Sequence, residues 1–130
     1  MILSFTGSGS VPMNKKQIRS LKSVLKVIQP GEVHHGDCIN ADAQFDAICQ
    51  EFEIKIVIHP PTNTIHRAWC DGPLTTILEP KPYILRNHDI VDACSTLIAG
   101  PHRPEYIRSG TWSTVRYARK QNRTVIIVEP

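Results

Sequence analysis

The sequence has no Cys-x-x-Cys pair, although it contains four cysteines among its 130 residues. The wide spacing of Cys38, Cys49, Cys70 and Cys94 argues against a structural zinc site and a disulfide framework, and is typical of a reducing cytoplasm. No apolar run is long enough to span a membrane, so a membrane partner is not expected. The opening Met-Ile-Leu-Ser-Phe predicts a strand rather than a signal peptide.

Aromatic residues are also scarce, and the net charge is small. Aromatics make up 6% of the chain and the net charge is +3, which argues against single-stranded nucleic acid as a partner. One predicted helix carries five basic residues: Lys15, Lys16, Arg19, Lys22 and Lys26. Such a run is usually a solvated helix face, and nucleic-acid binding is the alternative interpretation.

Histidine is better represented, with six residues in the chain. His34, His35 and His59 are potential metal ligands together with Cys38. Their spacing matches no standard metal site, so neither a metal nor a cofactor is expected.

Composition and periodicity predict one α/β domain covering residues 1–130. The chain is 41% hydrophobic and 21% charged, as in ordinary globular proteins. Short apolar runs alternate with amphipathic segments. The expected strands are Ile2–Thr6, Glu32–His35, Ile54–Ile58, Ser95–Ala99 and Thr124–Glu129. The expected helices are Asn14–Gln29, Asn40–Phe52, Tyr83–Cys94 and Thr111–Asn122.

This alternation predicts a Rossmann-like three-layer sandwich. Its parallel sheet would have five strands in the order 3-2-1-4-5, with helices on both faces. Residues Pro60–Pro82 are rich in proline and are expected to form a loop with one helical turn at most. That loop should lie at the mouth of a ligand crevice, where His66 or Trp69 would cover the ligand or contact a neighbouring subunit.

Two turns of small residues indicate where a ligand would bind. Thr6-Gly7-Ser8-Gly9-Ser10 follows the first strand, and Ser109-Gly110-Thr111 opens the last helix. In the predicted strand order these turns flank one crevice beyond the carboxyl ends of the strands. Glycine allows a close backbone approach, and the first N–H groups of a helix point at an anion. The two turns together predict a ligand that carries phosphate.

Further polar residues belong to the same end of the predicted sheet. Asp37 or Asp42 can accept hydrogen bonds from ribose hydroxyls, although Asp42 can instead complement a helix dipole. Arg86 can pair with a phosphate through two N–H groups, or be an ordinary surface arginine. Trp112 can stack on a base or pack against the sheet. His59 ends the third strand.

Six motifs in register make the chain similar to the SLOG superfamily, and above all to its small stand-alone bacterial and phage members. The motifs are Phe5-Thr6-Gly7-Ser8, His34-His35-Gly36-Asp37-Cys38 with Ala41-Asp42, His59-Pro60-Pro61, Arg86-Asn87 with Ile90-Val91, Leu97-Ile98-Ala99 with Pro101, and Arg108-Ser109-Gly110-Thr111-Trp112 with Thr114-Val115-Arg116. The resemblance covers nearly the whole chain. It implies a Rossmann-like fold, a nucleotide-type ligand, a homo-oligomer and a cytoplasmic location in a bacterial or phage-infected cell.

One departure from the superfamily concerns catalysis. Its phosphoribohydrolases carry a Gly-Gly-x-Gly-Thr-x-x-Glu motif, and the glutamate takes part in cleaving the N-glycosidic bond. Aligned on Gly110-Thr111, that position is Thr114 in this chain. A threonine supplies neither a carboxylate base nor a negative charge. The resemblance therefore implies binding without hydrolysis, and no catalytic residue is assigned.

The leading interpretation is a protein that senses or sequesters a nucleotide or an ADP-ribose derivative, such as a phage-encoded sponge for an immune signal. The alternatives are a phosphoribohydrolase whose carboxylate is Asp37, Asp42 or Glu105, and single-stranded DNA binding as in DprA. The expected ligand-binding residues are Thr6, Gly7, Ser8, Asp37, Asp42, His59, Arg86, Asn87, Gly100, Arg108, Ser109, Gly110, Thr111, Trp112 and Thr114.

Overall fold

The computed structural model describes all 130 residues. Six strands alternate with four helices along the chain. The strands are β1 (Ile2–Gly7), β2 (Glu32–His35), β3 (Lys55–Ile58), β4 (Thr75–Ile77), β5 (Thr96–Gly100) and β6 (Thr124–Ile127). The helices are α1 (Lys15–Ile28), α2 (Ala41–Glu51), α3 (Tyr83–Asp92) and α4 (Gly110–Lys120). None of these helices is long and apolar enough to cross a membrane.

The strands form one sheet in the order β4-β3-β2-β1-β5-β6, and every neighbouring pair is parallel. The α/β class and the parallel pairing agree with the sequence prediction. The prediction of five strands in the order 3-2-1-4-5 was wrong, because the sheet has a sixth strand at its edge.

The additional strand lies inside the segment that was expected to be a loop. Strand β4 pairs with β3, with Ile56 opposite Thr75 and Ile58 opposite Ile77. It has only three residues and lies between Pro73 and Pro80, so its sequence shows neither a long apolar run nor a clear alternation. As an exposed edge strand it needs little apolar surface, which is why periodicity did not reveal it.

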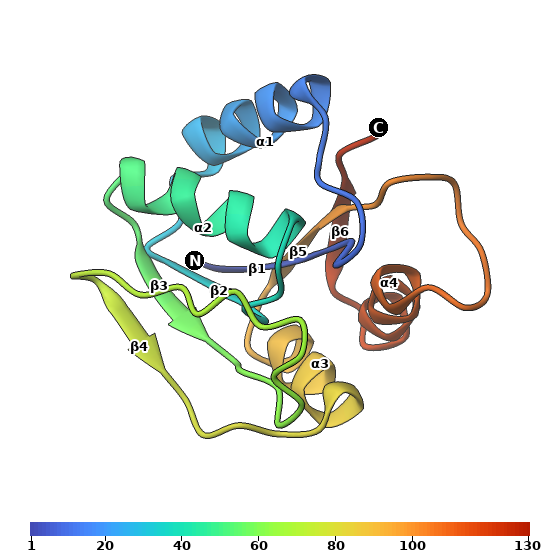
Figure 1. Cartoon of the computed structure of the whole chain (residues 1–130). Helices are drawn as coiled ribbons and strands as arrows, with labels where there is room; N and C mark the ends of the chain where they lie inside the picture. Colours follow the sequence, from blue (N-terminus) through green and yellow to red (C-terminus); the bar gives the residue numbers. More distant parts are fainter.

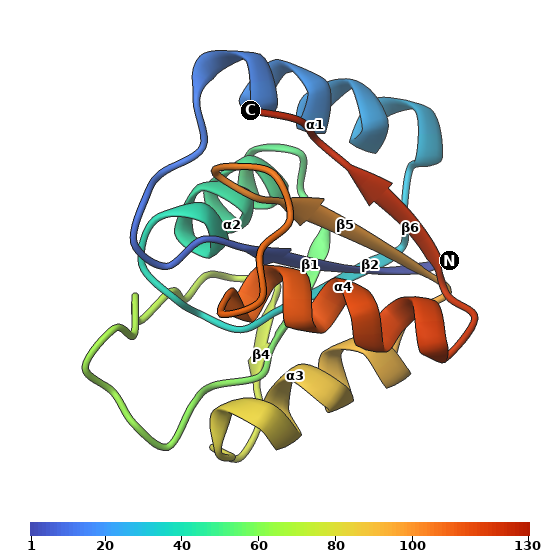
Figure 2. The same ribbon diagram turned by 90° about the vertical axis from the view of Figure 1, so that its right-hand side faces the viewer.

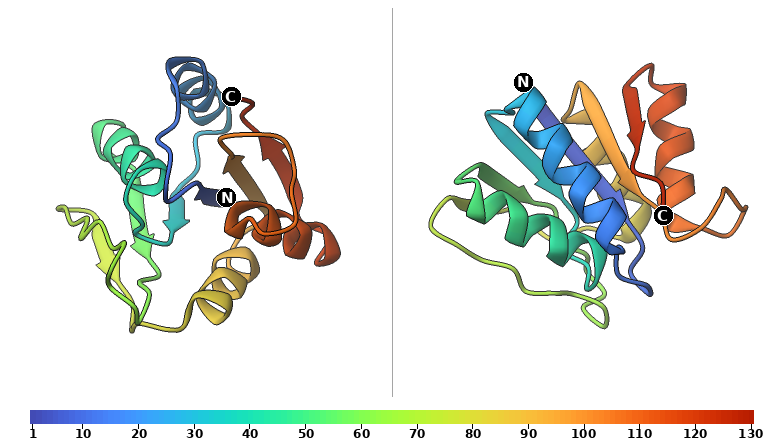
Figure 3. Two further views of the ribbon diagram at one scale, coloured as in Figure 1. Left: turned by 45° about the vertical axis from the view of Figure 1, so that its right-hand side comes forward. Right: turned by 90° about the horizontal axis from the view of Figure 1, so that it is seen from above.

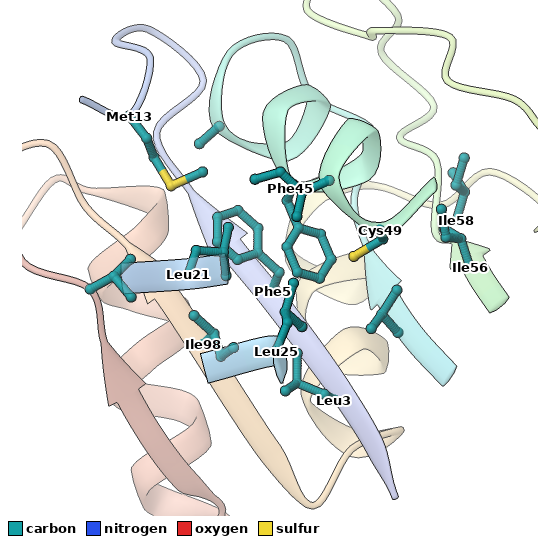
Figure 4. Close-up of a cluster of buried hydrophobic side chains, with 14 residues drawn as sticks. Leu3, Phe5, Met13, Leu21, Leu25, Phe45, Cys49, Ile56, Ile58 and Ile98 are labelled. Carbon is teal, nitrogen blue, oxygen red and sulfur yellow. The ribbon is translucent and has the colours of Figure 1, made fainter. Parts of the chain in front are cut away.

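Helices cover both faces of the sheet. Helices α1 and α2 lie on one face, and α3 and α4 on the other (Figures 1 and 3). The larger apolar core lies under α1 and α2, where Leu21 and Leu25 pack with residues of the sheet. At its centre the rings of Phe5 from β1 and Phe45 from α2 stack with centroids 4.5 Å apart (Figure 4). A smaller apolar cluster lies between the sheet and α4.

Local signals set the start of α1. The Asn14 side chain accepts a hydrogen bond from the Gln17 backbone N–H at 2.8 Å, and the Gln17 side chain accepts one from the Asn14 N–H at 3.0 Å. This reciprocal pair satisfies two N–H groups that a helix start leaves without partners. Gln17 also donates to the carbonyls of Pro101 and Val128, and so fastens α1 to the ends of β5 and β6.

Parallel pairing brings the carboxyl ends of all the strands to one edge of the sheet. The loops after β1 and β5 and the start of α4 gather there, on the left of Figure 2. Residues that are about a hundred positions apart in the sequence meet at this edge, which is the usual ligand-binding edge of such sheets.

The stacked rings in the core provide a test of the fold. We expect Phe45→Ala to lower the free energy of unfolding by about 3–5 kcal/mol, because it removes a fully buried ring and leaves a cavity. The matched control is Ile84→Ala, since Ile84 is 71% exposed and its truncation should change stability by less than about 0.5 kcal/mol. Urea unfolding measures both. Equal effects of the two substitutions would contradict the described core.

Candidate functional site

A cavity of about 320 Å³ opens at the carboxyl ends of β1 and β5. Its walls come from the turn after β1, the turn after β2, helix α3 and the loop that leads into α4. Ten of the predicted ligand-binding residues line it, namely Thr6, Gly7, Ser8, Asp42, Arg86, Asn87, Arg108, Ser109, Gly110 and Thr111. The structure thus brings together the two small-residue turns, as the strand order required.

Backbone N–H groups on two sides of this cavity have no partner within the chain. Those of Gly110 and Thr111 belong to the first turn of α4, where the Ser109 side chain accepts only from the Trp112 N–H, at 3.2 Å. Those of Ser8 and Gly9 lie in the turn after β1. Four unpaired donors and the positive end of a helix dipole make this wall suited to an anion.

Arg86 brings a full positive charge to the cavity. Its side chain comes from α3 and is only 5% exposed, yet no carboxylate lies within 4.0 Å of its nitrogens. Its acceptors are neutral: Nη1 donates to the carbonyls of Gly36 and His59, and Nε donates to Asn87 Oδ1 at 2.7 Å. The one hydrogen-bond partner of Nη2 is the Cys38 sulfur, at 3.8 Å, so this end of the guanidinium still has donors for a ligand.

Gly36 makes room for that arrangement. A Cβ atom at this position would lie 2.5 Å from Arg86 Nη1 and 2.7 Å from Cζ. The absence of a side chain lets the guanidinium reach the carbonyl at the end of β2. From the sequence, Gly36 was only part of a motif, because nothing there indicated that an arginine fifty residues later would approach it.

Asp42 is the acid of the cavity. It lies in the first turn of α2 and is 5% exposed. Its Oδ2 accepts a hydrogen bond from the Cys38 N–H at 3.1 Å, whereas Oδ1 is buried without any hydrogen-bond partner. Burial raises the pKa of this carboxyl above its ordinary value of 3.8, although the charges of His35 and Arg86 oppose the rise.

Asp37 does not line the cavity, because its carboxylate is occupied elsewhere. Oδ2 pairs with Arg67 Nε at 2.9 Å, and Oδ1 accepts from the Cys70 N–H at 2.9 Å. These contacts anchor the segment after β3 to the turn after β2. His66 from that segment lines a groove beside the cavity, while the Trp69 ring is exposed and stacks on Arg67.

His59 also faces away from the cavity. Its Nε2 lies 2.8 Å from His34 Nδ1, and His34 Nε2 lies 2.7 Å from Glu32 Oε2. Burial, followed by the charge of His34, lowers the pKa of His59 to about 4. The contribution of His59 to the cavity is its carbonyl group, which holds Arg86.

The remaining three predicted residues are structural. Gly100 ends β5 and lies against Met13 and Phe5. Trp112 is buried in the cluster under α4, and its indole N–H donates to the Arg103 carbonyl at 3.2 Å. Of the two interpretations of Trp112, stacking on a base and packing against the sheet, the structure therefore shows packing. The Thr114 hydroxyl donates to the Gly110 carbonyl at 2.9 Å, inside the helix.

Several residues of the cavity wall were not predicted from the sequence. Tyr83 from α3, and His102 and Tyr106 from the loop before α4, line it. The available signal for Tyr106 was its position, because it is an aromatic residue in a proline-rich loop just ahead of Ser109-Gly110. No group of three or more histidine, cysteine, aspartate or glutamate side chains is placed to hold a metal ion.

Comparison with known proteins identifies the fold. No protein-family model and no curated protein sequence matches the chain. Solved structures do match: the molybdenum cofactor binding protein from Rippkaea orientalis is 17% identical with a TM-score of 0.72, covering 99% of this chain and 76% of that one. The Moco carrier protein from Chlamydomonas reinhardtii is 15% identical with a TM-score of 0.65 and the same coverages.

DNA processing protein A (DprA) from Streptococcus pneumoniae is 16% identical, with a TM-score of 0.70 over 96% of this chain. The match spans 49% of the DprA chain, so this chain corresponds to about half of that protein. The chain therefore shares the Rossmann-like fold of these three structures. Because the identities are low, the likeness describes the architecture alone, and the ligand has to be argued from the side chains described above.

The unpaired oxygen of Asp42 predicts a pH-dependent stability difference. Asp42→Asn keeps an oxygen for the Cys38 N–H and removes a buried negative charge. Because the pKa of Asp42 is raised in the folded state, ionisation weakens the fold above that pKa, and the loss disappears as the pH falls toward 3.8. We expect Asp42→Asn to be more stable than the parent at about pH 7.5 and to keep a smaller advantage at about pH 4.5.

Urea unfolding of both proteins at the two pH values measures this difference. An advantage of the same size at both values would show that Asp42 is not a destabilising buried carboxylate.

Proposed function

We propose that the cavity binds a nucleotide or an ADP-ribose-derived small molecule through its phosphate, without hydrolysing it. One observation carries the proposal: a buried guanidinium, that of Arg86, opens onto a cavity and has no carboxylate within 4.0 Å of its nitrogens. A buried charge without an opposite charge is costly, and a bound anion removes that cost. Phosphate is the common anion that accepts several N–H groups together with an arginine.

The other walls of the cavity support the same ligand. The N–H groups of Gly110 and Thr111, and those of Ser8 and Gly9, lie on the walls of this cavity. Arg108 adds a second positive charge at the exposed rim. The volume of about 320 Å³ is at the lower end of the range of about 300–1,000 Å³ that holds small ligands, which suits a ligand of nucleotide size.

Binding without hydrolysis is argued from the acids. The Thr114 hydroxyl, at the position of the catalytic glutamate in phosphoribohydrolases, donates within α4. Asp37 is paired with Arg67, and Glu105 is paired with Arg116 at 2.9 Å on the surface. Of the three acids that the sequence offered for catalysis, only Asp42 lines the cavity. In the cell, a binding module of this kind would sense a nucleotide signal or sequester it.

The molybdenum cofactor is a second candidate ligand, because two structures with this fold carry it in their names. It is a phosphate ester of a pterin, so the N–H groups of α4 and Arg86 would hold its phosphate. The unpaired Oδ1 of Asp42 would accept from an N–H group of the pterin ring. The N–H donors of this cavity fit the phosphate of that group, whereas Asp42 offers only one unpaired oxygen to the two parallel donors of the pterin edge.

Two substitutions test the phosphate wall. A Cβ atom at Gly110 would meet no other atom within 4 Å, and the φ angle there is not positive, so Gly110→Val should fold normally while covering the N–H groups that meet the phosphate. Arg86→Lys keeps the charge but not the forked donors. We expect each to weaken AMP binding by about 1.5–3 kcal/mol, the range for a hydrogen bond to a charged group. Isothermal titration calorimetry measures it.

Gly31→Val is the matched control. A Cβ atom at Gly31 would likewise meet no other atom within 4 Å, and the φ angle there is not positive. Gly31, however, precedes β2 at the opposite end of the sheet. It should bind AMP like the parent protein. If Gly110→Val and Arg86→Lys also bind like the parent while folded, the cavity is not the ligand site.

The ligand and the absence of turnover are tested directly. Mass spectrometry of small molecules released from the purified protein should find a phosphate-bearing nucleotide, and a pterin would instead select the second candidate. Incubation with AMP or NAD should release no free base at enzyme-like rates. Rapid base release that disappears in Asp42→Asn would replace the binding function with a hydrolytic one.

A further inference from the structure

The Oδ1 atom of Asp42 is an acceptor without a donor. It is buried, it belongs to a side chain that lines the cavity, and no group of the protein donates to it. The only other buried side-chain atom in this condition is the neutral hydroxyl of Thr75, on the edge strand β4. Buried polar atoms are nearly always hydrogen-bonded, and a carboxylate oxygen loses more than a hydroxyl when it is not.

The protein does not use Asp42 to neutralise Arg86. The two side chains line one cavity and influence each other's charge, but their charged atoms are not within 4.0 Å. A ligand that satisfies both must therefore present an anion to Arg86 and a hydrogen-bond donor to Asp42. A fully ionised phosphate group supplies the first and not the second.

We infer that Asp42 selects the sugar of the nucleotide, by accepting a hydrogen bond from a ribose hydroxyl. This inference rests on the proposed function and names the ligand class as ribonucleotides. The site would bind a ribonucleotide more tightly than the deoxyribonucleotide that lacks the contacted hydroxyl, at the 2′ or the 3′ position. One unpaired oxygen matches one hydroxyl donor. The amino–imino edge of a guanine or a pterin presents two parallel donors, and Oδ2 is already held by the Cys38 N–H.

The structure also decides between the two acids that follow β2. Both oxygens of Asp37 accept hydrogen bonds from the segment after β3, at 2.9 Å each, and Asp37 is outside the cavity wall. Asp42 is held by a single bond to Oδ2, which leaves Oδ1 for the ligand. Asp42 is thus a specificity-determining residue rather than part of the phosphate wall.

The test compares AMP, 2′-deoxy-AMP and 3′-deoxy-AMP on three proteins by calorimetry. The parent should bind one of the two deoxy analogues roughly tenfold or more weakly than AMP, because the analogue leaves the buried carboxylate unpaired. In Asp42→Asn that ratio should fall below roughly threefold, since the amide turns an N–H group to the sugar and no charge is left unpaired.

Asp92→Asn is the matched control, because it makes the same change of carboxylate to amide outside the cavity, where Asp92 Oδ1 accepts a hydrogen bond from the Tyr117 hydroxyl at 3.0 Å. It should keep the parent's ratio between AMP and the deoxy analogue. Equal binding of all three nucleotides by the parent overturns the role of Asp42 and leaves nucleotide binding intact. The same conclusion follows if Asp42→Asn keeps the ratio or if Asp92→Asn abolishes it. Failure of the folded parent to bind any of these nucleotides overturns the proposed function itself.

Discussion

The position of Arg86 is the constraint on which the ligand-binding edge depends. One side chain from α3 holds the carbonyl groups that follow β2 and β3, and so connects the ends of two neighbouring strands to a helix on one face of the sheet. It reaches them because Gly36 has no side chain. The arginine is thereby buried and hydrogen-bonded in place, so that binding of the proposed phosphate would cost little side-chain entropy.

The same edge keeps two opposite charges apart. Arg86 and Asp42 lie on one cavity, and a direct ion pair would satisfy both, yet each is held by neutral backbone groups. The protein gives up stability to keep an unneutralised donor and an unneutralised acceptor at fixed positions. Such an arrangement is characteristic of functional sites, where local rules of burial are broken for the sake of a ligand.

Much of the architecture could be predicted because it depends on apolar periodicity and on the parallel crossover rule, both readable in β1, β2 and α2. The edge strand β4 could not, since three residues between prolines, two of them exposed, carry no periodic signal. The two small-residue turns were predictable from backbone chemistry. The separate roles of Asp37 and Asp42 were not, because they depend on Arg67 arriving from thirty residues away. Nothing in the sequence around Trp112 distinguished packing against the sheet from stacking on a base.

The fold presents unpaired N–H groups at the start of α4, which suit an anion but do not select a particular one. Structures with this fold are named for binding the molybdenum cofactor or for processing DNA, although all share the edge where helix and strand ends meet. What distinguishes ligands is the set of side chains added to that edge. Here the addition is one buried cation, Arg86, and one buried unpaired acceptor, Asp42 Oδ1. The proposed ligand, a phosphorylated ribose, would meet both, with its phosphate at Arg86 and one hydroxyl at Asp42.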